Sequence, residues 1–173
     1  MTLKSQNKFF FLNYQNIIIL FFFIILGVVG YILHKDYGIS LDEESTRLHG
    51  LVSLNYISEF FFSNEKFAFQ TNEIIPKLNE YDYKEYGIFF EILLTLIIEI
   101  FLEIKNFSEI FHARHFLNHL LFIISVICFY FLCLNIFKNK IYSFFGAAIL
   151  YTSPRIFGNS FYNDKDLVFL SFF

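Results

Sequence analysis

The chain has few charged residues, few cysteines and few prolines. The low numbers of charged residues and of cysteines exclude several classes of protein. Charged residues make up 17% of the 173 residues, whereas hydrophobic residues make up 56%. A soluble domain of this length needs far more polar surface, so the composition predicts a membrane protein. The net charge of −3, without any basic tract, argues against a nucleic-acid partner.

The two cysteines do not form a pattern typical of a disulfide framework or a thiolate metal site. Cys128 and Cys133 lie within one apolar run. The sequence therefore predicts packed thiols.

Long apolar runs predict an all-α, polytopic membrane protein. The predicted spans cover about 12–33, 115–137 and 141–158, the last interrupted near its end by Pro154, and a further span starts at 167–173. A secretory signal peptide is the rival interpretation of the first run, but no small-x-small cleavage site follows it. Seven apolar residues at the end are too few to cross a bilayer. We therefore expect an N-terminal fragment of a longer protein.

The lysines indicate the orientation. Lys4 and Lys8 precede the first span, and Lys138 and Lys140 follow the second, so the positive-inside rule assigns both groups to the cytoplasm. Residues 34–111 then form an acidic external loop, in which Ser40 and Glu43 predict a capping box that opens a helix. The expected location is a bacterial inner membrane.

The segment Ile88–Ile104 decides this topology. Its polar residues recur every four positions and form one stripe on a helix: Glu91, Thr95, Glu99 and Glu103. Acidic side chains at the centre of a spanning helix each cost about 2.5–3.5 kcal/mol. We therefore predict a non-spanning interfacial helix, with its glutamates in water and its apolar face in lipid.

This layout brings two acidic motifs to the external side. Asp42-Glu43-Glu44 follows the first span, and Asp164-Lys165-Asp166 precedes the start of the last. Ionisable residues beside spans are costly and often functional. The pair is the main sequence indication of a reaction centre.

The ordered set of motifs resembles the N-terminal part of the C-type (GT-C) membrane glycosyltransferases. The closest group is family 39, which includes protein O-mannosyltransferases and lipid A aminoarabinose transferases. The motifs that carry the resemblance are Ile39-Ser40-Leu41-Asp42-Glu43, Tyr86-Gly87, Ala113-Arg114, Tyr151-Thr152-Ser153-Pro154 and Asn163-Asp164-Lys165-Asp166.

The resemblance implies a GT-C fold with juxtamembrane helices in the first external loop. It also implies a polyprenyl-phosphate-linked sugar as donor and a lipid, protein or polysaccharide acceptor. Asp42 matches the first-loop aspartate that acts on the acceptor, Glu43 matches its neighbouring glutamate, and Asp166 matches the second-loop acid, with Asp164 as second choice. No cofactor is implied with certainty, and the need for a divalent metal stays open.

Glycosyl transfer requires a carboxylate that accepts the proton of the acceptor hydroxyl. It also requires a cation opposite the departing phosphate. The candidate cations near the external side are Arg47, Lys84, Arg114, Arg155 and Lys165.

Structural interpretations compete with each of these roles. Asp42 and Glu43 suit a first helical turn, Glu43 and Arg47 form an i,i+4 pair, and Asp164 and Asp166 suit a solvated loop. Arg114 and Arg155 are also suited to anchoring span ends by snorkelling. His112, His115 and His119 have a spacing that a metal could use, although a structural role is commoner. The rival functions are a transporter or flippase segment and an inactive remnant.

Overall fold

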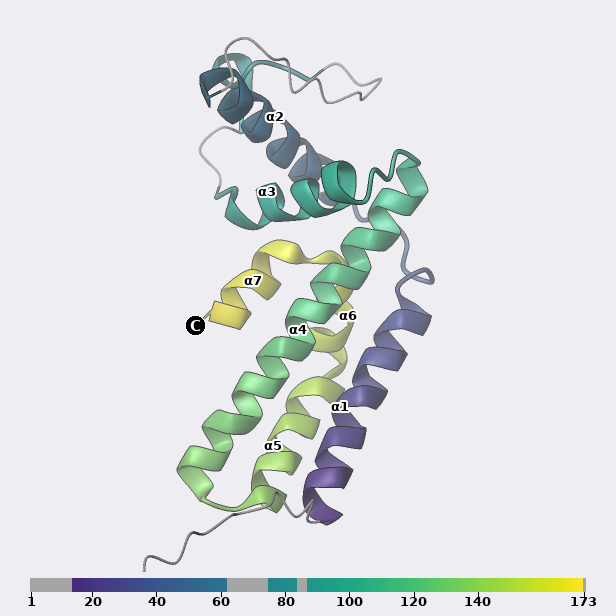
Figure 1. The fold of residues 1–173 in the computed structure, drawn as a ribbon, viewed down its shortest axis with the longest axis vertical. Coiled ribbons are helices and arrows are strands. Elements are labelled where there is room, and N and C mark those ends of the chain that lie inside the picture. The colour runs from purple at the N-terminus through teal and green to yellow at the C-terminus, as the bar shows by residue number, and fades with distance from the viewer. Residues whose placement is uncertain (1–13, 62–74, 84–86, 173) are drawn as a thin grey trace, which may run out of the picture.

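The computed structural model describes residues 14–61, 75–83 and 87–172, and within these ranges it contains helices and no strand (Figure 1). The prediction of an all-α chain is therefore confirmed for the described residues. The α-helices are α1 (Tyr14–Leu33), α2 (Glu43–Phe61), α3 (Phe89–Thr95), α4 (Phe107–Phe137), α5 (Lys140–Thr152), α6 (Pro154–Tyr162) and α7 (Asp164–Phe172). A 3-10 turn, η1, covers Leu78–Glu80, and a π-helical segment, η2, covers Leu96–Phe101 and continues α3.

Two helices, α1 and α4, are long and apolar enough to cross a membrane. The α4 helix begins earlier than the predicted start at residue 115. The side chain of Asn106 accepts a hydrogen bond from the Ser108 N–H at 3.0 Å and caps the helix there. The residues from 107 to 111, predicted as the end of the external loop, therefore belong to a helix.

The predicted span 141–158 is divided into two helices. Ser153 has an extended backbone, with ψ of 113°, because the following Pro154 disfavours a helical conformation there. The α5 helix alone is about 20 Å long, shorter than a hydrocarbon core of about 30 Å. Residues 158–166, which connect the predicted spans, form the last turn of α6 and the first turn of α7, joined at Asn163.

The apolar core lies where α1, α4, α5 and α7 pack together. Its buried residues are Leu26, Phe122, Ile123, Val126, Tyr130, Ala147, Tyr151 and Leu167. A second cluster, made by Leu94, Ile98 and Ile110, packs α3 and η2 against the first turns of α4. Figure 1 shows α1, α4 and α5 side by side, with α2 and α3 at one end of this bundle.

The helix formed by α3 and η2 runs crosswise to α4 (Figure 1). From Phe89 to Phe101 it is at most about 20 Å long, which fits the prediction of a segment that does not span. The predicted orientation is wrong for two of its three glutamates. Glu91 and Thr95 are 5% and 1% exposed, and the side chain of Glu99 is 6% exposed. These residues face protein rather than water because two arginines lie opposite them, whereas Glu103, beyond η2, is exposed as predicted.

Candidate functional site

A cluster of buried charges joins four helices at the end of the bundle where α2 and α3 lie. Its centre is Arg114 on α4, which is 1% exposed. The Nη2 atom of Arg114 donates to Glu91 Oε2 at 2.5 Å and to Asp164 Oδ2 at 3.0 Å. The same nitrogen lies 3.4 Å from the hydroxyl oxygen of Thr46 on α2. One guanidinium group thus connects α2, α3, α4 and α7.

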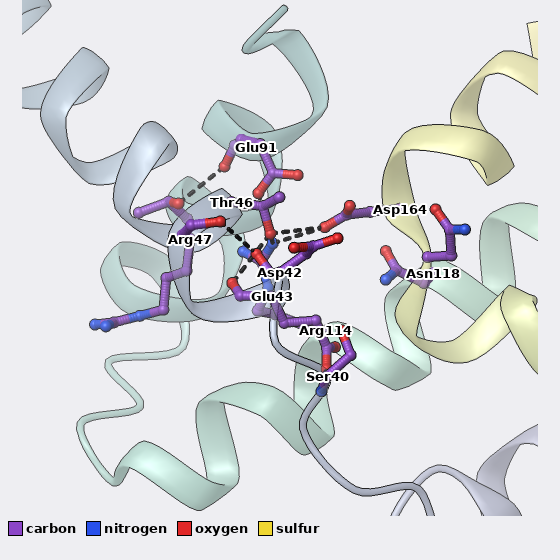
Figure 2. A network of polar contacts seen from close by, with 12 residues as sticks. Ser40, Asp42, Glu43, Thr46, Arg47, Glu91, Arg114, Asn118 and Asp164 are labelled. Carbon is purple, nitrogen blue, oxygen red and sulfur yellow. Dashed lines mark hydrogen bonds and ion pairs between the residues drawn. The ribbon is translucent and has the colours of Figure 1, made fainter. Parts of the chain in front are cut away.

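The beginnings of α2 and α7, where the two acidic motifs lie, are adjacent at this cluster. The hydroxyl of Thr46, one turn after Asp42, donates to Asp164 Oδ2 at 3.2 Å, as Figure 2 shows. The first turn of α2 and the first turn of α7 therefore lie side by side. That the two motifs share one side of a membrane stays a prediction.

Glu43 belongs to a separate buried pair. Its Oε1 lies 2.7 Å from Nε2 of His115, and its Oε2 accepts from the Ser40 N–H at 2.6 Å. The second contact confirms the glutamate half of the predicted capping box. The other ring nitrogen of His115 lies 3.2 Å from the His34 carbonyl oxygen, so both nitrogens face acceptors.

Arg47 pairs with Glu99 rather than with Glu43. Its Nε and Nη2 atoms donate to the two carboxylate oxygens of Glu99, each at 2.9 Å. Such a two-pronged contact is stronger and more directional than a single hydrogen bond. The expected i,i+4 pair of Glu43 with Arg47 is therefore wrong: Glu43 contacts His115, and Arg47 contacts Glu99.

Burial in the cluster raises the pKa of Glu91 to about 8, with the charge of Asp164 adding to the rise and that of Arg114 opposing it. A carboxyl group with this pKa is largely protonated at neutral pH. The cluster then holds one guanidinium and one ionised carboxylate, so its buried charges balance.

The predicted catalytic acids have three different environments. Asp42 is exposed, and within the described residues its carboxylate has no hydrogen-bond or ion-pair partner. Glu43 is buried in its histidine pair. Asp166 is exposed in the first turn of α7, which Asn163 caps: the Asp166 N–H donates to Asn163 Oδ1 at 3.2 Å, and the Asp166 carboxylate accepts from Asn163 Nδ2 at 2.9 Å. The second choice, Asp164, is the acid that lies in the cluster.

The predicted phosphate-binding cations also differ. Arg114 is already engaged with two carboxylates and does not snorkel. Arg155 and Lys165 are exposed. Burial lowers the pKa of His49, the nearby charge of Lys165 lowers it further and Asp164 opposes this, so Lys165 lies close to α2. Lys84 lies outside the described residues.

The three histidines with metal-like spacing have different partners. His112 lies 3.1 Å from the Ser108 hydroxyl, His115 pairs with Glu43, and His119 lies 2.8 Å from the Ser160 hydroxyl. Among the residues that the structure describes, no three His, Cys, Asp or Glu side chains are placed to hold a metal ion.

Sequence reasoning missed several residues of the cluster. Glu91, Glu99, Thr46, His115 and Asn118 were not predicted as site residues. The glutamate stripe could have indicated the buried role of Glu91 and Glu99, because a polar stripe on an apolar helix can face cations of the protein as well as water. Two buried atoms here, Arg114 Nε and Asn118 Oδ1, have no hydrogen-bond partner. Such atoms are rare in folded proteins.

Comparison of the chain with protein-family models, with curated proteins and with solved structures gives no match.

Proposed function

We propose that the chain is part of an integral membrane glycosyltransferase of the GT-C type. It transfers a sugar from a polyprenyl-phosphate donor to an acceptor at the non-cytoplasmic face of the membrane. The observation that supports the proposal is the contact between the first turns of α2 and α7, in which Thr46 and Asp164 are 3.2 Å apart. These turns, more than a hundred residues apart in sequence, carry the two acidic motifs.

Asp42 is the acid best suited to act as general base. Its carboxylate is exposed and has no partner among the described residues, so it is available to accept the proton of an attacking hydroxyl. The neighbouring Glu43 is held by His115 and by the Ser40 N–H. That pair fixes the start of α2 and, with it, the backbone that carries Asp42.

Lys165 is the cation best placed to face the departing phosphate. It is exposed on α7 beside Asp164 and lies close to α2. A phosphate that leaves the sugar gains negative charge, which a nearby ammonium group stabilises.

The test is sugar transfer by the protein in membranes. The donor probes are polyprenyl-phosphate mannose and polyprenyl-phosphate aminoarabinose, and the measurement is release of the polyprenyl phosphate. Asp42→Asn should lower the rate by about 10²–10⁴-fold, because general-base catalysis contributes that much. Glu44→Gln, which changes the next exposed acid, should leave the rate unchanged.

Two outcomes would contradict the proposal. Full activity of the Asp42→Asn protein would remove Asp42 from the reaction. Absence of transfer from both donors by the folded wild-type protein would contradict the proposed activity itself.

A further inference from the structure

A small apolar cavity lies at the opposite end of the bundle from the charge cluster. It has a volume of about 210 Å³ and lies between the first turns of α1 and α5. Its lining includes Tyr14, Ile18 and Ile19 from α1 and Lys140, Ile141 and Phe144 from α5. Figure 1 shows these helix ends far from α2, α3 and the start of α7.

The cavity is open toward the apolar surface of the bundle. Ile18 and Ile141, which line it, are 55% and 51% exposed. An apolar cavity of about 150 Å³ stays dry and takes up benzene. The space between α1 and α5 is therefore large enough for several methylene groups of a hydrocarbon chain.

Among the described residues, Lys140 is the cation that lines this apolar space. Nζ of Lys140 donates to Asn16 Oδ1 at 2.6 Å, which holds the ammonium group at the junction of α5 and α1. An ammonium group has three N–H donors. Within the described residues Asn16 is the one partner that Lys140 has, so two donors remain for an anion.

We propose that this cavity binds an anionic phospholipid. One acyl chain occupies the space between α1 and α5, and the phosphate of the headgroup accepts hydrogen bonds from Lys140. The occupant follows from the combination of an apolar lining with a fixed cation beside α1, a helix long and apolar enough to cross a bilayer. Basic positions between helices at a membrane surface recognise anionic headgroups in this way. The inference does not depend on the proposed sugar transfer.

The absence of tryptophan from the chain gives a direct test. Tyr14→Trp places a single tryptophan at the cavity rim, and the full chain is reconstituted in vesicles that contain bromine-labelled lipid. Brominated phosphatidylglycerol should quench this tryptophan more than brominated phosphatidylcholine at equal mole fraction. Phe131→Trp, on an exposed part of α4 outside the cavity, should show no such preference.

Two lysines of one turn provide the matched comparison. In the Tyr14→Trp background, Lys140→Gln should reduce the preference for phosphatidylglycerol by about fivefold, the effect of one basic residue near a charged surface. Lys138→Gln removes the same charge two residues away, from a side chain outside the cavity lining, and should preserve the preference.

Three results would overturn the proposal. The first is equal quenching by the two brominated lipids at position 14. The second is equal loss of preference in the Lys138 and Lys140 variants, which would indicate bulk electrostatic attraction. The third is loss of phosphatidylglycerol quenching on addition of inorganic phosphate at constant ionic strength, which would indicate an anion site without a lipid chain.

Discussion

The guanidinium group of Arg114 lies between two carboxylates that belong to different helices, those of Glu91 and Asp164. All three side chains are at most 7% exposed. Removal of one partner from such a buried group leaves a buried donor or acceptor without its hydrogen bond, which costs about 1–3 kcal/mol. The three residues therefore act as one unit, and the protonation state of Glu91 affects how firmly α3 is held.

At the residue scale, the raised pKa of Glu91 predicts a pH-dependent stability. The unfolded group titrates near its model value of 4.5, whereas the folded group titrates near 8. Between these values the folded state binds more protons than the unfolded state, so the free energy of unfolding should fall as pH rises from about 4.5 to about 8. Above pH 8 this contribution should level off.

The Glu91→Gln variant removes the titrating group. Its free energy of unfolding, measured by denaturant titration in detergent, should lose the part of the pH slope that Glu91 contributes. Glu44→Gln, at an exposed position, provides the control. An unchanged slope in the Glu91→Gln variant would show that Glu91 is ionised in the folded protein throughout this range.

At the scale of elements, the π-helical segment keeps the glutamate stripe on one face. Four residues overshoot one turn of an α-helix by about 40°, so Glu91, Thr95 and Glu99 would drift round an ideal helix. The π turns of η2 contain more residues per turn and reverse part of this drift between Thr95 and Glu99. Glu91 can then reach Arg114 while Glu99 reaches Arg47.

Gly50 allows α2 to approach α3 closely. A Cβ atom at this position would lie 2.8 Å from the backbone oxygen of Glu91 and still closer to the Thr95 hydroxyl. To relieve this clash the backbone of α3 at Glu91 would have to shift, which costs free energy. The absence of a side chain at residue 50 is therefore a condition for the contact between the two helices.

We predict that Gly50→Ala destabilises the protein by about 1–3 kcal/mol, the usual cost of overpacking. The measurement is the free energy of unfolding in detergent. Gly158→Ala is the matched control, since a Cβ there meets no atom within 4 Å, and alanine favours the helix by about 1 kcal/mol. Equal effects of the two substitutions would show that helix propensity, rather than packing of α2 on α3, determines the result.

At the scale of the whole molecule, the adjacent first turns of α2 and α7 predict a common aqueous side for the two acidic motifs. Glu44 and Asp166 are exposed, so a cysteine at either position is available to a reagent. Asp164 is 4% exposed and unsuitable for this purpose. Asn139, in the turn between α4 and α5, is exposed at the other end of α4.

In a background with Cys128→Ala and Cys133→Ala, an impermeant maleimide should label cysteines at positions 44 and 166 in intact cells. A cysteine at position 139 should be labelled only after permeabilisation, because the flanking lysines favour the cytoplasm. Labelling of positions 44 and 166 from opposite sides would contradict the arrangement. Labelling of position 139 alone in intact cells would show that the orientation is inverted.

The sequence allowed a good prediction of which segments are helices, but a poorer one of how they end and what they face. The capping role of Glu43 and the apolar helices α1 and α4 were predictable, because local hydrogen bonds and apolar periodicity determine them. The helical structure of residues 158–166 was not predicted, because Asn163 alone separates α6 from α7. The glutamate stripe was assigned to water because the positions of its arginine partners were unknown.

The sequence by itself determined where apolar helices form and where the acidic motifs lie along the chain, since both depend on residues close in sequence. The tertiary structure alone decided that Asp164 is buried while Asp42 and Asp166 are exposed. It also decided that Arg114 and Arg47 neutralise the glutamates of α3 and η2. The physical reason is that the state of a buried charge depends on its partners, and here those partners are 23 to 68 residues away. Only the packing of α2, α3, α4 and α7 brings them within hydrogen-bonding distance.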